Sequence, residues 1–80
     1  MTFGENLREE RRKLGLTVEA VAKGCGVSRS YITLIENDKR APGKKILAKI
    51  ATSLKIKTVI VLNWYLDDLR EELQKTSPLD

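Results

Sequence analysis

The chain of 80 residues has no histidine, one cysteine and four aromatic side chains, and each shortage argues against a class of protein. A single cysteine cannot close an intrachain disulfide, and without histidine too few ligands remain for a structural zinc site. Four scattered aromatic rings are too few for a platform that stacks single-stranded nucleic acid. We therefore expect no metal and no cofactor, and we expect Cys25 to be a small buried residue, with a redox-sensing thiol as the alternative.

Long apolar runs are also absent. The longest extends from Val59 to Leu62, far short of the roughly 18 residues that a membrane-spanning helix needs. The first twelve residues, MTFGENLREERR, lack the apolar core of a secretory signal peptide. These absences predict a cytoplasmic protein with no membrane partner.

The net charge of +4 is unevenly distributed along the chain. Residues 1–57 carry 13 Lys and Arg against 6 Asp and Glu, whereas residues 58–80 carry 2 against 5. The front of the chain could therefore meet a polyanion such as nucleic acid, although lysines also simply keep proteins soluble. The length predicts one small domain, for which oligomerisation is a natural source of stability.

The segment 17–37, TVEAVAKGCGVSRSYITLIEN, is typical of two short helices joined by a tight turn. Thr17 and Ser28 are N-cap candidates, and the glycines between them can adopt the positive φ of a turn. On the second helix Ile32 and Ile35 recur at the spacing of a buried face. The opposite face comprises Arg29, Ser30, Thr33 and Leu34, of which the first three are basic or hydroxyl-bearing. A short capped helix of this kind suits the major groove of DNA.

A first helix is expected from Phe3 to Leu14. Thr2 and Glu5 form a possible capping box, and Gly15 is a good stop signal. Leu7 and Leu14 are expected on the buried face of this helix.

Arg11 lies on that same face, and a buried cation needs a partner. Glu36 follows Ile32 by one helical turn and should also point inward, so we predict an ion pair between Arg11 and Glu36. The alternative is that Arg11 extends along the surface to solvent.

The rest of the chain predicts two more helices. One runs from residue 43 or 44 to Leu54, and Thr58 caps a last helix that continues to Gln74 or Lys75. Leucines at alternating spacings of three and four give the last helix a coiled-coil-like seam, and its length of roughly 25 Å means that its far half should project. A second copy of the chain is the simplest cover, so we predict a homodimer; the alternative is a helix folded back over its own domain. The predicted interface comprises Val61, Leu62, Trp64, Tyr65, Leu66, Leu69 and Leu73.

The run from Leu7 to Ile56 resembles the Cro/phage-repressor-like (XRE) helix-turn-helix family. The family patterns are R-x-x-x-G-(L/M)-(T/S), L-A-x-x-x-G-V-S and I-x-x-I-E-N/R-G-x-R-x-P. Here they appear as Arg11…Gly15-Leu16-Thr17, Val21-Ala22…Gly26-Val27-Ser28 and Ile32…Ile35-Glu36-Asn37…Arg40…Pro42. The resemblance implies an all-α, five-helix domain that binds double-stranded DNA, usually as a dimer on a palindromic operator. It also implies a prokaryotic, phage or plasmid origin.

Carried over by position, the resemblance implies base contacts from Ser28, Arg29, Ser30, Thr33 and Leu34. It implies phosphate contacts from Thr17, Tyr31, Asn37, Lys39 and Arg40, although Tyr31 could equally pack at the edge of the domain. Arg29 can donate two hydrogen bonds to guanine, which discriminates against other bases by ~1–3 kcal/mol. Lys39 and Arg40 would add affinity without sequence information.

Three positions or segments depart from the family. Val18 replaces a glutamine that commonly touches phosphate. Lys55 replaces the glycine that usually ends the fourth helix, which predicts a strained or a differently shaped corner. The extended acidic last helix is not a general feature of the family.

We therefore predict a helix-turn-helix domain over residues 1–57, a dimerising helix over 58–75 and a flexible tail over 76–80. The predicted function is that of a dimeric transcriptional repressor. The alternative is a regulator of the antitoxin or restriction–modification controller type, acting partly through a protein partner such as an antirepressor, a toxin or RNA polymerase. An enzyme is not expected, because the chain has no histidine and no inward-facing pair of carboxylates near its basic surface. The acidic pairs at 67–68 and 71–72 suit the exterior of the dimer helix better than a metal site.

Overall fold

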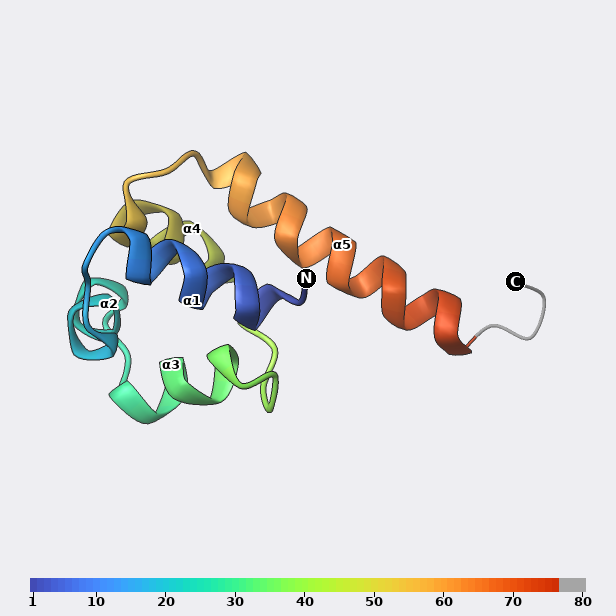
Figure 1. The fold of residues 1–80 in the computed structure, drawn as a ribbon, viewed down its shortest axis with the longest axis horizontal. Helices are drawn as coiled ribbons and strands as arrows, with labels where there is room; N and C mark the ends of the chain where they lie inside the picture. Colours follow the sequence, from blue (N-terminus) through green and yellow to red (C-terminus); the bar gives the residue numbers. More distant parts are fainter. Residues whose placement is uncertain (77–80) are drawn as a thin grey trace.

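Five α-helices and no strands make up residues 1–76, which the computed structural model describes, with side chains to residue 75. The helices are α1 (Phe3–Lys13), α2 (Val18–Cys25), α3 (Arg29–Glu36), α4 (Lys44–Leu54) and α5 (Thr58–Thr76). The all-α, five-helix fold expected from the sequence is confirmed (Figure 1). The predicted flexible tail lies outside the described residues, apart from Thr76, where α5 ends.

Side-chain caps fix where the first three helices begin. Thr2 Oγ1 accepts a hydrogen bond from the Glu5 amide at 3.1 Å, and the Glu5 carboxylate accepts one from the Thr2 amide at 2.8 Å, which completes the predicted capping box. The Thr2 bonds also lower the pKa of the exposed Glu5 carboxyl. Thr17 and Ser28 cap α2 and α3 in the same way, each accepting from the amide three residues on. Neighbouring residues therefore fix where α2 and α3 begin.

The core lies where α1, α2, α3 and α4 meet the first turns of α5. Leu7, Ile32 and Ile50 are among its fully buried members. Cys25 is buried, as expected, with its sulfur 3.6 Å from Ser53 Oγ, and burial raises the pKa of its thiol. The prediction that Leu14 lies on the buried face was wrong: α1 ends at Lys13, and Leu14 turns out to solvent with 48% of its surface exposed.

The first turn of α1 holds two distant segments together. Asp38, just beyond α3, accepts hydrogen bonds from Thr2 Oγ1 at 2.8 Å and from the Gly4 amide at 3.2 Å. Asp68 of α5 accepts one from the Phe3 amide at 3.1 Å. Gly4 is required here, because a Cβ would collide with the backbone carbonyl groups that end α3. These contacts join α1, the end of α3 and α5.

Helix α5 leaves the bundle after its first turns and extends away from it (Figure 1). The described chain is accordingly elongated, with extents of 42 × 24 × 22 Å. The helix begins at Thr58 itself, so Thr58 is its first residue and not the cap that the sequence predicted. Among the described residues, no helix combines the length and the apolar character needed to cross a bilayer.

Within residues 1–76, two residues other than glycine adopt the left-handed conformation, Asp38 with φ 58° and Lys55 with φ 56°. Of the two alternatives expected at Lys55, the strained corner is the one present, since a side chain in this region is disfavoured by roughly 1–2 kcal/mol. Asp38 is different, because its side chain makes the hydrogen bonds to the first turn of α1.

Lys55→Gly is expected to raise the free energy of unfolding by about 1 kcal/mol, because glycine adopts a positive φ without strain. Asp38→Gly relieves the same strain but removes the hydrogen bonds to Thr2 and Gly4, so it should destabilise the domain. Urea denaturation of both variants measures the contrast. Equal stabilisation by the two glycines would show that the Asp38 contacts contribute nothing.

Candidate nucleic-acid interface

The pair α2 and α3 with the turn between them forms a compact unit at one end of the bundle (Figure 1). Gly26 ends α2 in the left-handed conformation with φ 68°, which lets the chain reverse towards Ser28. On α3, Ile32 and Ile35 are buried in the core, at 0% and 1% exposure. The residues predicted to read bases are all exposed: Ser28, Arg29, Ser30, Thr33 and Leu34. The helix therefore presents one face to solvent and anchors the other.

The residues predicted to contact phosphates lie at the start of α2, on α3 and in the loop after α3. Thr17, Asn37, Lys39 and Arg40 are exposed, and the Arg40 guanidinium lies over the Tyr31 ring, 4.8 Å from its centroid. Tyr31 is half-buried, and its hydroxyl accepts a hydrogen bond from the Gly43 amide at 3.2 Å. This bond leaves the hydroxyl hydrogen available for a further acceptor. Tyr31 therefore packs at the edge of the domain, which was one of the two alternatives. This packing does not prevent its hydroxyl from donating to a phosphate, which was the other.

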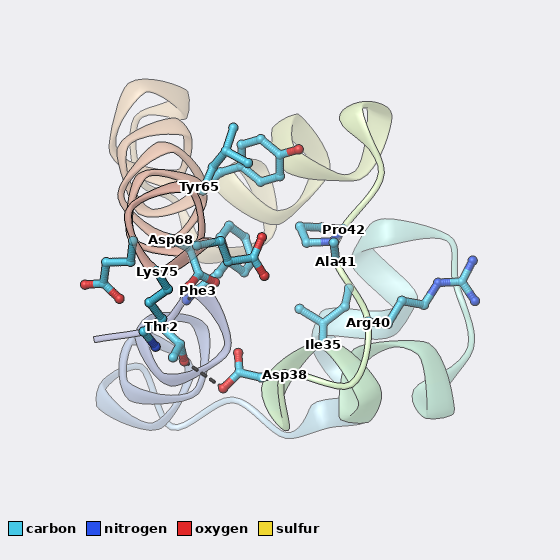
Figure 2. A pocket seen from close by; sticks show the side chains of 13 residues that line it. Thr2, Phe3, Ile35, Asp38, Arg40, Ala41, Pro42, Tyr65, Asp68 and Lys75 are labelled. Carbon is cyan, nitrogen blue, oxygen red and sulfur yellow. Dashed lines mark hydrogen bonds between the residues drawn. The ribbon is translucent and has the colours of Figure 1, made fainter. Parts of the chain in front are cut away.

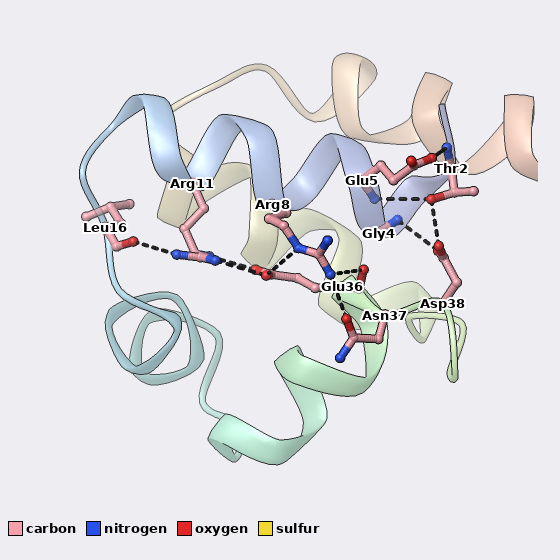
Figure 3. A network of polar contacts seen from close by, with 9 residues as sticks. All are labelled: Thr2, Gly4, Glu5, Arg8, Arg11, Leu16, Glu36, Asn37 and Asp38. Carbon is pink, nitrogen blue, oxygen red and sulfur yellow. Dashed lines mark hydrogen bonds and ion pairs between the residues drawn. The ribbon is translucent and has the colours of Figure 1, made fainter.

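A buried ion pair braces α3 against α1 (Figure 3). Arg11 donates to both carboxylate oxygens of Glu36, from Nε to Oε2 at 2.7 Å and from Nη2 to Oε1 at 3.0 Å. Arg11 Nη1 also donates to the Leu16 carbonyl at 2.9 Å, and Glu36 is only 4% exposed. The ion pair predicted from the sequence is present, in the bidentate geometry that fixes orientation as well as distance.

Arg8 adds a second layer to this brace. Its Nη2 donates to the Glu36 carbonyl at 2.9 Å and to Asn37 Oδ1 at 2.6 Å, and its Nε lies 3.6 Å from the Glu36 carboxylate. The hydrogen bond to Glu36 and the charge of that carboxylate raise the pKa of Arg11, against the opposing effect of its burial. The carboxylate therefore has a positive partner on two sides, which compensates its removal from water.

The first turn of α2 differs from the family pattern and makes a contact of its own. Val18 packs partly buried against the core, so this position contributes no polar side chain to the surface. Its neighbour Glu19 is exposed, and one of its carboxylate oxygens lies 3.1 Å from Nη1 of Arg29 on α3. An acidic side chain therefore stands beside the arginine expected to read bases.

Helix α5 has two apolar faces, and only one of them is available to a partner. Leu62, Leu66 and Leu69 are each 40–41% exposed and Leu73 is 61% exposed, as the predicted seam requires. Val61 is 0% exposed, so its inclusion in the predicted dimer interface was wrong: it faces its own core.

Trp64 and Tyr65 also turn largely towards their own domain. Both are partly buried against the core, and the Trp64 ring meets the edge of Phe3 at a centroid distance of 6.0 Å. They border the exposed seam and do not form it.

A hollow of about 290 Å³ lies between the start of α1, the loop after α3 and α5 (Figure 2). Ile35, Pro42 and Tyr65 contribute apolar surface to it, whereas the Arg40 side chain points away from it (Figure 2). Within the described residues, no cluster of three or more acidic or cysteine side chains is arranged to hold a metal ion.

Residues 7–61 match the family model described as Helix-turn-helix. The match covers more than half of the chain, which therefore belongs to this family, of the Cro/phage-repressor-like (XRE) type. The resemblance predicted from the three sequence motifs is confirmed.

Two curated relatives come from Bacillus subtilis (strain 168). The chain is 35% identical over 78 residues to the uncharacterized HTH-type transcriptional regulator RghRB, and the aligned region covers 94% of this chain and 56% of the relative. It is 45% identical over 56 residues to the HTH-type transcriptional repressor RghR, and the aligned region covers 69% of this chain and 42% of the relative. The chain thus spans about half the length of the curated relatives it matches.

Solved structures share the fold. The restriction–modification controller protein C.AhdI from Aeromonas hydrophila superposes with a TM-score of 0.71 at 36% identity, over 74% of this chain and 89% of that one. The P22 c2 repressor, solved in complex with the synthetic operator 9T, gives a TM-score of 0.73 at 26% identity, over 80% and 97% of the two chains. The helix-turn-helix arrangement is therefore common to this chain, a controller and a repressor.

Sequence reasoning missed three polar residues that shape the candidate interface. Arg8 lies one turn before Arg11 on the same helix, so its helical spacing was a usable signal. Asp38 stands where the family pattern has glycine, which marks a position of positive φ. Glu19 carried no comparable signal, because its contact with Arg29 depends on how α2 and α3 cross.

Proposed function

We propose that the chain is a sequence-specific, double-stranded DNA-binding transcriptional regulator, and that it acts as a dimeric repressor on a palindromic operator. The observation that carries the proposal is the division of α3 into two faces. Ile32, Ile35 and Glu36 are buried and anchor the helix, while the opposite face is exposed to solvent. A helix held in this way can enter the major groove without rearrangement of the domain. The family and the relatives, named as transcriptional regulators and a repressor, support regulation and give no support to an enzyme.

Charge supports a DNA partner. The surplus of Lys and Arg lies in residues 1–57, which contain α3 and the loop after it. The surplus of Asp and Glu lies in residues 58–80, which contain the projecting helix α5. Basic residues that neutralise phosphates make binding strongly dependent on salt. The P22 c2 repressor, similar in fold, was solved on an operator, which supports the same mode of binding for this chain.

Dimerisation is supported by the exposed leucine seam on α5. Fully burying an exposed leucine side chain contributes about 1.5–3 kcal/mol, and each seam leucine, at 40–61% exposure, would contribute a fraction of this, summed over both subunits. Two subunits related by a two-fold axis would read two half-sites with centres roughly 34 Å apart.

A selection from random duplexes at near-physiological salt tests the proposal. We expect a palindromic motif with a fixed half-site spacing. A folded protein that enriches no motif, or only a single asymmetric site, would overturn the proposed dimeric reader.

Arg29→Ala is expected to relax the preference at one base pair in each half-site, by ~1–3 kcal/mol per contact. Lys39→Ala is expected to weaken binding to all duplexes alike and to lower the salt slope by about 1 per contact, because a phosphate contact carries no sequence information. Titrations on operator and random duplexes at several salt concentrations separate the two effects. Equal losses on both duplexes for Arg29→Ala would contradict its assignment as a base reader.

A second candidate is a regulator of the restriction–modification controller type that acts partly through protein contact. The similarity to C.AhdI favours it, together with the hollow beside α5. Under this alternative, part of the α5 surface would remain available to a protein partner when the chain is bound to DNA. Pull-down on operator DNA with candidate partners would distinguish the two.

A further inference from the structure

A carboxylate lies on the face that the proposed function directs at a polyanion. Glu19 Oε1 lies 3.1 Å from Arg29 Nη1, with side chains 57% and 70% exposed. Glu19 belongs to the first turn of α2, and Arg29 is the first residue of α3. The pair therefore links the two helices at the end of α3 that carries the predicted base readers.

The contact occupies one side of the guanidinium. The ion pair is made through Nη1, one of three nitrogens that together carry the five N–H donors of an arginine. Recognition of guanine needs two donors in a fork, one for O6 and one for N7. An ion pair through Nη1 alone would leave the donors of Nη2 and Nε for such a fork.

We infer that Glu19 is a specificity-determining residue, which holds Arg29 at Nη1 and withdraws it from phosphates. An unrestrained arginine beside DNA has many phosphate oxygens to choose from, and those contacts are the same on every sequence. Glu19 repels phosphates and offers Arg29 a competing partner, so binding to random DNA weakens. A guanine in the right place still offers two acceptors to the remaining donors. The inference rests on the proposed function, because it assumes that Arg29 reads a base.

A purely structural role makes different predictions. An acidic residue in the first turn of a helix interacts favourably with the helix dipole, and an exposed ion pair contributes little to stability. Either effect would change folding slightly and would leave the choice between base pairs untouched. Discrimination at the base pair read by Arg29 is therefore the informative measurement.

The test compares Glu19→Gln with the wild type on three duplexes: the selected operator, the operator with the guanine contacted by Arg29 replaced, and a random duplex. We expect Glu19→Gln to bind random DNA several-fold more tightly and to lower the discrimination at that base pair by about tenfold. Glu9→Gln is the matched control, because Glu9 is also exposed and pairs with Lys13 at 3.4 Å on α1. The Glu9→Gln variant should discriminate at the base pair read by Arg29 as well as the wild type does.

A double-variant cycle makes the inference specific to the pair. In an Arg29→Ala background, Glu19→Gln should no longer alter discrimination at that base pair. The inference is overturned if Glu19→Gln changes operator and random binding by the same factor, or if its effect on discrimination survives in the Arg29→Ala background. A wild-type protein with no base preference would overturn the proposed function as well, whereas a preference that Glu19→Gln leaves intact would overturn only the role of Glu19.

Discussion

Arg11→Met is expected to lower the free energy of unfolding by about 3–5 kcal/mol, because it leaves the Glu36 carboxylate buried without its bidentate partner. Small domains are stable by roughly 0.05–0.15 kcal/mol per residue, so the loss is a large fraction of the total for 80 residues. Arg8 lies 3.6 Å from the same carboxylate and can replace only part of the interaction. Thermal and urea denaturation measure the effect.

Arg12→Met is the matched control, since Arg12 is the next residue on α1 and is exposed. It should change stability by less than about 0.5 kcal/mol. The double variant Arg11→Met with Glu36→Leu should recover much of the loss, because it removes the buried charge together with its partner. An Arg11→Met domain as stable as the control would show that the ion pair does not hold α3 in place.

Leu66→Asp combined with Leu69→Asp is expected to convert a dimer to monomers and to weaken operator binding by roughly 10²–10⁴-fold. Both leucines lie on the exposed seam of α5, at 41% and 40% exposure, so the folded subunit tolerates a charge there. A partner helix would have to bury the new carboxylates, which is strongly unfavourable. Without dimerisation, the second half-site no longer benefits from the high effective concentration that a linked subunit provides.

Sedimentation measures the oligomeric state, and a titration on the operator measures the affinity. Asn63→Asp with Gln74→Asp adds the same charge to exposed polar positions of α5 and should leave both results unchanged. Monomers with undiminished affinity would separate DNA binding from dimerisation, and an unaltered dimer would move the interface away from the seam.

Local signals explain why the sequence predicted most of the fold correctly. The caps at Thr2, Thr17 and Ser28 and the turn at Gly26 each depend on a few neighbouring residues. The ion pair between Arg11 and Glu36 was also within reach, because two charges at inward positions of adjacent helices need each other.

The errors arose where local pattern and tertiary packing differ. Leu14 follows the period of α1 but lies beyond its last turn, where the backbone leaves the helix. Val61 lies on a helix with two apolar faces, and periodicity alone does not assign one face to the core and the other to a partner. Glu19 and Asp68 act through residues distant in the sequence, and only the arrangement of the helices brings those groups together.

The division of α3 into an anchored and an exposed face has an evolutionary consequence. Ile32, Ile35 and Glu36 hold the helix, while Arg29, Ser30 and Thr33 stand in solvent. Exposed positions of this kind usually accept substitution at little cost in stability, within about 0.5 kcal/mol. Duplicated copies of such a gene could therefore diverge to new operators one side chain at a time, each intermediate remaining folded.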